Sequence, residues 1–372
     1  MKIEKIYLKN FRNYDELNIS PNSIINVFIG KNAQGKTNLL EAIHFASFGR
    51  SQRVQKEIDL IRWDQPQAII NLTFKKFDVD QFVAFEISTT KQRRILLNDQ
   101  PIKVKQLIGK FNTVLFTPED LFLIKGSPTN RRKFLDAEIS QASPIYFADL
   151  ITYNKILLQR NSLLKQIKDG QVRIDSLALW NEQLTNVAVK IISKRLEAID
   201  KINQLANDLQ QKISSNVENL KIVYEIHHAE NEILPENLTA WFNKKLFESQ
   251  QADIIRGTTS IGPHHDDIKF LINDRDIRSF GSQGQQRTAI LSLKLSELEF
   301  LHEETGDYPI LLLDDVMSEL DATRRSALLK FLNRQQIQTF ITATEAEYFP
   351  RDTNAEFFTV QAAKVDKLPV DN

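Results

Sequence analysis

The stretch SIINVFIGKNAQGKTNLLEAIHFASF, residues 23–48, decides the fold class of this 372-residue chain. It opens with a short β-branched run, and apolar residues recur at helical spacing after residue 38. Between the two, GKNAQGKT (residues 30–37) matches G-x-x-x-x-G-K-[ST] in the strand–loop–helix context that a phosphate-binding loop needs. The stretch therefore predicts an α/β protein built around a P-loop.

The P-loop predicts how a nucleoside triphosphate and Mg²⁺ would be held. Gly30 and Gly35 allow backbone N–H groups to close around a phosphate, and the helix that follows adds the positive end of its dipole. We expect Lys36 to be exposed in the loop and to bind the β- and γ-phosphates, while Thr37 offers its hydroxyl to Mg²⁺. The predicted nucleotide-binding residues of the loop are Gly30, Lys31, Asn32, Ala33, Gln34, Gly35, Lys36 and Thr37.

A second segment, PILLLDD (residues 309–315), predicts the other half of the metal site. An all-apolar run is typical of a central parallel strand that is buried on both faces. Such a strand would bring Asp314 next to the triphosphate to hold Mg²⁺, and Asp315 is placed to orient or deprotonate the attacking water. The two carboxylates also fit a helix N-cap after a strand, and they could serve both roles.

A third segment, GSQGQQR (residues 281–287), precedes TAILSLKLSELEFL, which predicts an amphipathic helix. Ser282 and the backbone N–H groups at the start of that helix predict a second phosphate-binding surface. Because the P-loop already serves one nucleotide, we expect this second surface to cap the nucleotide of a partner subunit. Taken alone the segment fits an ordinary helix cap, but its position shortly before the aspartate-bearing strand favours the nucleotide role.

Composition excludes several classes of protein. The absence of cysteine excludes a disulfide scaffold, thiol catalysis and any Cys-ligated metal site. The 48 basic and 48 acidic side chains cancel, so a polyanionic partner would need a local basic patch. The N-terminus has no apolar core of a signal peptide, and no apolar run is long enough for a membrane helix. We therefore expect a cytoplasmic protein without a membrane partner.

The rest of the chain divides into a strand-rich part and a helical part. Strands are predicted at residues 2–9, 68–74, 82–88 and 94–97, with a tight turn at Asn98–Asp99 that recurs at Asn273–Asp274 after a strand at 268–272. From 131 to about 215 the chain has one glycine and one proline, and a heptad row runs from Leu177 to Ile213. This row predicts either a coiled-coil arm or, as we favour, a long helix packed within a helical lobe.

Together these motifs resemble an ABC-type ATPase head, and specifically the RecF family of SMC-like gap-repair ATPases. The resemblance implies an α/β fold, an ABC-type P-loop ATPase head with a mixed sheet around the P-loop helix and an inserted helical lobe. It implies an ATPase lobe formed by 1–115 and 256–372, the second part with the signature and Walker B motifs, and a helical lobe at 116–255. The segments that carry the resemblance are LKNFRNY (8–14), the P-loop, FTPEDL (116–121), KGSPTNRRKFLD (125–136), GPHHDD (262–267), GSQGQQRT (281–288) and LLLDDVMSELD (311–321).

The resemblance also assigns roles at single positions. It implies ATP as the nucleotide, Lys36, Asp314, Asp315 and Ser282 as the catalytic residues, and Thr37 with Asp314 as the Mg²⁺ ligands. The remaining implied sites are Ser282, Gly284 and Gln285 on the partner's ATP, Arg12 and Asn32 as accessory nucleotide contacts, Ser318–Asp321 as an interface loop, and Thr344 at a switch position. Two positions depart from the family: FTPEDL has no glutamine, and His265 stands where the family usually has arginine.

The function implied is that of an ATP-gated homodimeric DNA clamp with weak, DNA-dependent ATPase activity. It would act in the repair of gapped DNA and stalled replication and in the SOS response, on double-stranded DNA and single/double-strand junctions. Its partners would be mediators of the RecO and RecR type that help load a recombinase. One alternative is an ABC transporter nucleotide-binding subunit, which the early LKNFRNY disfavours. The second is an ATP-dependent nuclease, for which we expect too few residues after Thr344. The third is a small-molecule kinase, which has no use for the signature segment.

The DNA surface is predicted from local charge. Arg50, Arg53 and Lys56 follow the P-loop helix, and residues 131–133 (RRK) form a second basic cluster. Either cluster also fits a solvated face in a neutral chain. Basic residues interleaved with aromatic ones, which would indicate stacking on single strands, are absent, so we expect contacts to duplex phosphates.

Overall fold

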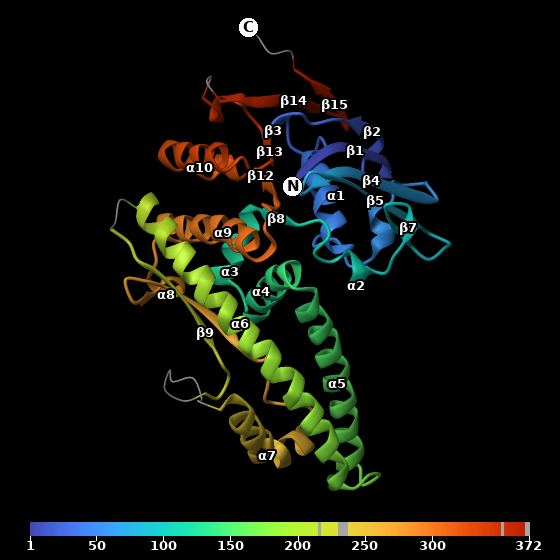
Figure 1. Ribbon diagram of the computed structural model, residues 1–372, viewed down its shortest axis with the longest axis vertical. Coiled ribbons are helices and arrows are strands. Elements are labelled where there is room, and N and C mark those ends of the chain that lie inside the picture. The colour runs from blue at the N-terminus through green and yellow to red at the C-terminus, as the bar shows by residue number, and fades with distance from the viewer. Residues whose placement is uncertain (215–216, 230–236, 351–352, 369–372) are drawn as a thin grey trace. The chain divides into compact units, whose positions relative to one another are not determined.

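The computed structural model describes residues 1–214, 217–229, 237–350 and 353–368. The chain folds as two compact units, unit 1 from 1–120 and 294–372 and unit 2 from 121–293 (Figure 1). These boundaries differ from the expected divisions after residues 115 and 255. The signature segment 281–287 consequently belongs to unit 2 and the P-loop to unit 1.

Unit 1 contains a mainly parallel sheet that carries the P-loop. Its strand order is β15-β14-β3-β13-β12-β8, and only the β14–β15 pair is antiparallel among its described strands. Because β3 and β12 are central, they are buried on both faces, as the apolar run at 309–315 predicted for β12. The bounds are β3 Ile25–Ile29, β8 Thr113–Phe116, β12 Ile310–Asp314, β13 Thr339–Ala343, β14 Ala355–Gln361 and β15 Lys364–Lys367.

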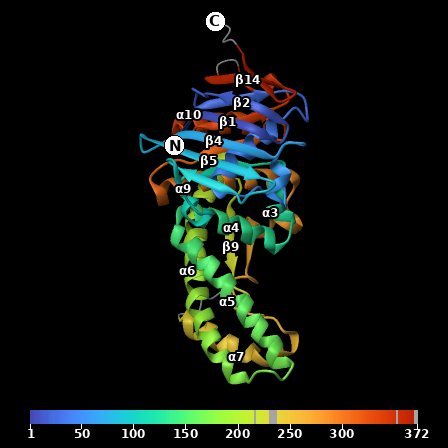
Figure 2. The ribbon, with the colours of Figure 1, turned by 90° about the vertical axis from the view of Figure 1, so that its right-hand side faces the viewer.

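A second sheet of unit 1 is antiparallel, with the order β2-β1-β4-β5-β6-β7. Figure 2 shows β2, β1, β4 and β5 lying side by side in this order. The expected turn at Asn98–Asp99 is confirmed, with both residues at positive φ (49° and 63°). The bounds are β1 Lys2–Phe11, β2 Tyr14–Ile19, β4 Gln67–Lys76, β5 Val79–Ser88, β6 Arg94–Leu97 and β7 Gln100–Pro101.

Helix α1 (Lys36–Phe48) joins the two sheets of unit 1 into one core. Its apolar side chains pack with strands of both sheets, and the ring of Phe45 meets that of Phe85 edge-on at 5.1 Å. Contact on several sides explains why every residue of α1 from Leu39 to Phe48 is buried. The P-loop helix is therefore held rigidly between the sheets. Two further α-helices lie wholly in the described part of unit 1, the short α2 (Val104–Leu107) and α10 (Ala322–Gln335).

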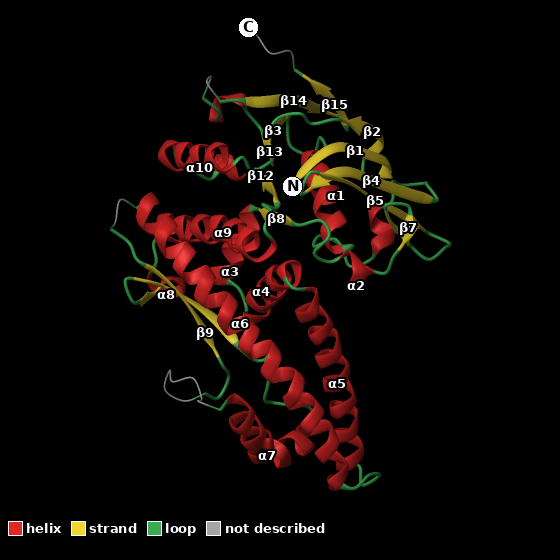
Figure 3. Ribbon diagram, in the orientation of Figure 1, coloured by secondary structure: helices red, strands yellow, loops and turns green. Residues whose placement is uncertain are grey.

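Unit 2 is dominated by two long helices, α5 (Pro144–Lys168) and α6 (Leu177–Ile213), which lie side by side (Figure 3). Helix α6 spans the predicted heptad row, and it packs on α5, α7 and β9 of the same unit. The interpretation as a long helix packed in a helical lobe is therefore confirmed. The other bounds are α3 Phe122–Lys125, α4 Pro128–Ala142, α7 Leu238–Arg256, α8 Ile277–Phe280, β9 Leu220–Glu225, β10 Asp267–Ile272 and β11 Arg275–Asp276.

Buried ion pairs tie the elements of unit 2 together. Arg131 is 4% exposed and forms two hydrogen bonds to the carboxylate of Asp267, at 2.7 and 2.9 Å. Arg195 of α6 binds Asp136 of α4 in the same way. The prediction that the basic cluster at 131–133 contacts DNA is therefore wrong for Arg131, because this guanidinium is buried and bound to Asp267 within unit 2.

Helix α9 (Gln283–Thr305) differs from the amphipathic helix that was expected. Every residue from Thr288 to Leu298 is buried, so no polar face exists along this stretch. Its polar side chains are paired instead: Ser292 donates to Gln210, and Lys294 binds Glu297 at 2.8 Å.

Within the described residues, no helix has the length and apolar character needed to cross a bilayer.

The first prediction concerns the fully buried pair Arg160–Asp253, joined at 3.0 Å between α5 and α7. Asp253→Ala leaves a buried guanidinium without its counter-ion, so we expect a loss of about 3–5 kcal/mol in the free energy of unfolding. Urea unfolding measures this loss. The control is Asp175→Ala, which breaks the exposed pair with Arg173 and should cost less than about 1 kcal/mol. Equal losses of stability in the two variants would contradict a stabilising role for the buried Arg160–Asp253 pair.

Candidate nucleotide-binding site

A cavity of about 390 Å³ lies over the P-loop in unit 1. It opens at the carboxyl ends of the parallel strands β12 and β13, the edge at which α/β proteins bind ligands. The P-loop, the two predicted carboxylates and three polar residues outside the predicted set meet there. The lining residues are Asn13, Asn32, Ala33, Gln34, Gly35, Lys36, Thr37, Asn38, Arg53, Asp314, Asp315 and Thr342.

The two glycines that frame the loop are required by close approach and by conformation. A Cβ on Gly30 would lie 2.2 Å from the carbonyl oxygen of Val360 in β14, so no side chain fits there. Gly35 has φ +116°, and a Cβ there would meet the amide of Asn13 at 2.8 Å. Glycine is therefore required at both positions for the loop to take this conformation at the start of α1.

Gln34 is held from both ends of the chain. The backbone N–H groups of Ala362 and Ala363, at the tip of the β14–β15 hairpin, donate to its side-chain and main-chain oxygens at 2.7 and 2.9 Å. Asn13, in the turn between β1 and β2, donates to the same main-chain oxygen at 3.3 Å. The buried Tyr14 hydroxyl donates to the carbonyl of Gly35. The shape of the loop is therefore fixed by segments more than 300 residues apart in sequence.

Lys36 is not the exposed loop residue that was expected. It is 6% exposed, and its Nζ donates to the carbonyl oxygens of Gly30 and Lys31, the latter at 2.9 Å. The loop wraps around the side chain, so its carbonyls converge on the ammonium group. Burial lowers the pKa of Lys36, and the nearby carboxylates of Asp315 and Asp314 oppose that shift.

Asp314 is the point at which three elements meet. Its Oδ1 accepts hydrogen bonds from the hydroxyls of Thr37 at 2.9 Å and Thr342 at 2.8 Å. Thr37 comes from α1, Asp314 ends β12, and Thr342 is its register partner on β13. The sequence prediction placed Thr37 and Asp314 here but did not include Thr342. The switch role of Thr344 stays a prediction. The five residues of β13, TFITA, are all buried and show no period-two alternation, so the sequence alone carries no signal for the role of Thr342.

Asp315 adopts a strained backbone conformation, with φ 55°. Its N–H donates to the Thr342 hydroxyl at 2.9 Å, and its carboxylate oxygen Oδ1 is buried with no hydrogen-bond partner among the described residues. Burial raises the pKa of the Asp315 carboxyl, and Lys36 acts in the opposite direction. A buried carboxylate oxygen without a partner, aimed at a polar cavity, is suited to bind a water or a cation.

The basic residues near the loop have specific partners. Arg12 makes two hydrogen bonds to Glu41, at 2.9 and 2.7 Å, and lines a neighbouring cavity rather than the P-loop cavity. Arg53, predicted to contact DNA, binds Asn38 at 3.0 Å and Glu41 at 3.1 Å and borders both cavities. Arg50 and Lys56 are exposed and form no ion pair with any described residue.

Ser282 lies in unit 2, directly before α9. Its Oγ accepts the N–H of Gln285 at 3.2 Å, and the Gln285 side chain accepts the N–H of Ser282 at 2.9 Å. This reciprocal pair is a capping box, so the expected helix cap is present. Ser282 is exposed, and its hydroxyl hydrogen stays available for a ligand. The nucleotide role of Ser282, Gly284 and Gln285 stays a prediction.

The donor set of the cavity suits Mg²⁺. The described residues contain no cluster of three or more His, Cys, Asp or Glu side chains arranged around a metal ion. Mg²⁺ in nucleotide sites needs no such cluster, because one or two carboxylates and the phosphates bind it. The Thr37 hydroxyl, the Asp314 carboxylate and the unpartnered oxygen of Asp315 provide oxygen ligands of that kind.

Sequence comparison identifies the relatives of this chain. Residues 2–365 match the RecF/RecN/SMC N-terminal domain family. The DNA replication and repair protein RecF of Halothermothrix orenii is 45% identical over 349 residues, covering 93% of this chain and 92% of that protein. The protein of the same description from Halalkalibacterium halodurans is 42% identical and covers 99% of this chain and 100% of its own length.

Structural comparison gives the same relatives. A structure of the recombination mediator protein RecF with ATP in the RecFOR pathway has a TM-score of 0.91, with 39% identity over 99% of this chain and 98% of that one. The Smc head bound to the C-winged helix domain of ScpA has a TM-score of 0.60 and 15% identity over 100% of this chain, which shows a likeness of fold alone. The predicted α/β fold of an ABC-type ATPase head is thus confirmed.

The second prediction concerns the raised pKa of Asp315. A carboxyl whose pKa is higher in the folded state is costly to ionise there, so it lowers stability progressively as the pH rises above the ordinary value of 3.8. Asp315→Asn removes this cost, and asparagine tolerates the positive φ. We expect a higher unfolding temperature than wild type at pH 7, with a gain that shrinks as the pH falls toward 4. Thermal unfolding between pH 4 and pH 7 measures it.

The matched control is Glu347→Gln, which neutralises an exposed carboxylate in the same unit. It should leave the unfolding temperature close to that of wild type throughout. A lower unfolding temperature for Asp315→Asn at pH 7, or a gain independent of pH, would contradict the electrostatic account.

Proposed function

Because this chain belongs to the RecF family, we propose that it is an ATP-dependent DNA-binding protein of DNA replication and repair. The relatives described as DNA replication and repair proteins, and the one solved with ATP as a recombination mediator, support this proposal. The finer proposal is an ATP-gated homodimeric clamp with slow, DNA-stimulated ATP hydrolysis. It would act on gapped or junction DNA in the cytoplasm and help mediators of the RecO and RecR type to load a recombinase.

The observation that carries the proposal is the meeting of Thr37, Asp314 and Thr342 beside a complete P-loop. Thr37 and Asp314 would hold Mg²⁺, which neutralises charge on the β- and γ-phosphates when bound. Thr342 orients the Asp314 carboxylate by its hydrogen bond. It also accepts the backbone N–H of Asp315, so one hydroxyl orients the Asp314 carboxylate and holds the main chain of Asp315.

The remaining residues of the cavity bind phosphate and position water. The P-loop N–H groups and the start of α1 would bind the phosphate oxygens. Lys36 would exchange its two carbonyl partners for phosphate oxygens, which bind an ammonium group more strongly because they are charged. Asp315, with its unpartnered oxygen and raised pKa, would accept a proton from the attacking water or orient that water.

Gating by ATP follows if a second protomer completes the site. The exposed capping box at Ser282 would present a hydroxyl and helix N–H groups to the γ-phosphate of the partner's nucleotide. Two such sites related by two-fold symmetry make nucleotide binding and dimer formation thermodynamically linked. Ser318, whose hydroxyl donates to the Asp315 carbonyl, would connect the interface loop 318–321 to the catalytic carboxylate.

DNA contacts are proposed at Arg50 and Lys56, which are exposed and unpaired among the described residues. Arg53 is a weaker candidate, because Asn38 and Glu41 already bind its guanidinium. Two copies of one basic patch, aligned by an ATP-closed dimer, would bind one rigid duplex more tightly than either alone through effective concentration.

The third prediction tests the proposed function by Ser282→Arg. A bulky cation at this exposed position should block the composite site and leave ATP binding to the monomer within about twofold of wild type, because the P-loop lies in the other unit. Analytical ultracentrifugation with ATP, ADP or no nucleotide should show an ATP-dependent dimer for wild type only. Lys36→Ala, as the control, should lose ATP binding and the dimer together.

The same samples with a labelled duplex give a second readout. Wild type should bind the duplex most tightly with ATP, and Arg50→Ala with Lys56→Ala should flatten the dependence of affinity on salt without changing ATP affinity. An ATP-dependent dimer of Ser282→Arg like that of wild type would overturn the composite site. Equal duplex affinity with and without ATP would contradict the ATP-gated clamp.

A further inference from the structure

The β14–β15 hairpin of unit 1 ends beside the P-loop. Strand β14 pairs in parallel with β3, and the stacked rings of Phe28 and Phe358, 4.8 Å apart, hold the register between the two strands. Thr359 lies opposite Ile29, the last residue before the P-loop, so β14 continues past the carboxyl end of β3. The tip of the hairpin, Ala362–Ala363, is therefore carried to the edge of the sheet at which a nucleotide would bind.

The tip adopts a conformation that its own sequence does not favour. Ala362 and Ala363 have φ 48° and 61°, in the left-handed region where a two-residue turn ordinarily has glycine or asparagine. An alanine pair there is strained, so contacts outside the hairpin are expected to hold the turn. The structure contains such contacts: the two N–H groups of the tip donate to Gln34 of the P-loop at 2.7 and 2.9 Å.

The two hydrogen bonds act on different parts of Gln34. Ala362 donates to its side-chain oxygen, whereas Ala363 donates to its main-chain oxygen. The peptide bond between Gln34 and Gly35 is trans, and the C=O and N–H groups of a trans peptide point in opposite directions. Because the Gln34 carbonyl is held against the hairpin, the N–H of Gly35 points away from the hairpin, where a phosphate oxygen would accept it.

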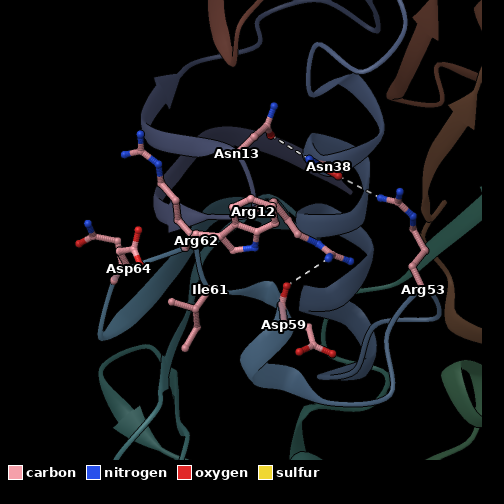
Figure 4. A pocket seen from close by; sticks show the side chains of 10 residues that line it. Arg12, Asn13, Asn38, Arg53, Asp59, Ile61, Arg62 and Asp64 are labelled. Carbon is pink, nitrogen blue, oxygen red and sulfur yellow. Dashed lines mark hydrogen bonds between the residues drawn. The ribbon is translucent and has the colours of Figure 1, made fainter.

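A second donor holds the same carbonyl group. The side chain of Asn13 donates to the main-chain oxygen of Gln34 at 3.3 Å, and its own oxygen accepts the Asn38 side chain at 2.8 Å, as Figure 4 shows for Asn38. Asn38 belongs to α1, the helix that follows the P-loop. On the hairpin side, a Cβ on Gly30 would collide with the carbonyl of Val360. The hairpin and the loop are thus in such close contact that a movement of one displaces the other.

We propose that the tip of the β14–β15 hairpin is a positioning element of the nucleotide site, which holds the Gln34–Gly35 peptide in its phosphate-binding orientation. The inference rests on the proposed function, because it assumes a phosphate on the P-loop. If opening of the tip weakens phosphate binding by some factor, bound phosphate must suppress opening of the tip by the same factor. The tip should therefore strengthen phosphate binding and become more ordered when phosphate is bound.

The fourth prediction compares two substitutions of Ala362. Ala362→Gly keeps the N–H group and favours the left-handed conformation, whereas Ala362→Pro removes the N–H group and cannot adopt a positive φ. In calorimetry, Ala362→Pro should weaken the binding of magnesium ATP about tenfold or more, because both hydrogen bonds of the tip are lost. Magnesium tripolyphosphate should lose the same factor, because only the phosphates contact the loop. The conservative Ala362→Gly should restore both affinities.

Substitution of Gln34 tests the same contact from the loop, also where Ala362→Pro does not fold. Gln34→Met keeps the length of the side chain and removes the acceptor for the Ala362 N–H. Both ligands should bind about two- to tenfold more weakly, the effect of one neutral hydrogen bond. The control is Asn98→Pro, which breaks the equivalent two-residue turn of another hairpin in unit 1. It should lower the unfolding temperature and leave both affinities close to those of wild type.

Amide hydrogen exchange gives a readout that a general loss of stability does not reproduce. Selective ¹⁵N-alanine labelling allows the N–H groups of Ala362 and Ala363 to be followed by nuclear magnetic resonance. In wild type, saturating magnesium tripolyphosphate should slow the exchange of both groups about tenfold or more, the factor expected for Ala362→Pro. In Gln34→Met, the exchange of the Ala362 N–H should respond less to the ligand, because its acceptor is gone.

The outcomes separate the inference from the function on which it rests. Wild-type affinities in both Gln34→Met and Ala362→Pro, or amide exchange at the tip that tripolyphosphate does not slow, would overturn the positioning role and leave the proposed function intact. Equal losses of affinity in Asn98→Pro and Ala362→Pro would assign the effect to stability and overturn the role as well. Failure of wild type to bind either ligand would overturn the proposed function and the inference with it.

Discussion

The candidate site depends on two hydrogen bonds: one carboxylate oxygen of Asp314 accepts the hydroxyls of Thr37 and Thr342. Through Thr37 it fixes the start of the P-loop helix, and through Thr342 it fixes the end of the neighbouring strand. Each of these two threonines is carried by a buried element: α1 lies between two sheets, and β13 lies between β3 and β12. The apolar packing of unit 1 therefore determines the positions of a few oxygen atoms to within hydrogen-bonding distance.

The P-loop depends on the same principle of distant support. Gln34 is bound by the tip of the last hairpin, and Gly35 by Tyr14 near the first strand. The hairpin tip consists of two alanines at positive φ (48° and 61°), a conformation that favours glycine or asparagine. This strain lies next to the proposed phosphate site, where pre-organisation of backbone N–H groups would matter most.

Features that a local sequence pattern determines could be predicted from the sequence. Features that depend on pairing between distant segments could not. The P-loop, the buried strand before Asp314 and the long helix from Leu177 each have a periodicity or motif of their own. Thr342 was missed because its role follows from the register between β12 and β13, which no local pattern encodes. Similarly, Arg53 was assigned by local charge alone, whereas folding brings it to Glu41. Lys36 was expected to be exposed because the enclosing carbonyls of its own loop could not be seen in a motif.

The central claim is that Asp314 and Thr37 hold Mg²⁺ for a nucleotide on the P-loop. The most direct test is calorimetric titration of ATP into wild type and Asp314→Asn, each with Mg²⁺ and with EDTA in its place. Asparagine keeps the acceptor oxygen for the two threonine hydroxyls but removes the negative charge that a metal needs. The account predicts that Mg²⁺ tightens ATP binding in wild type and not in Asp314→Asn. Equal tightening by Mg²⁺ in both proteins would contradict it.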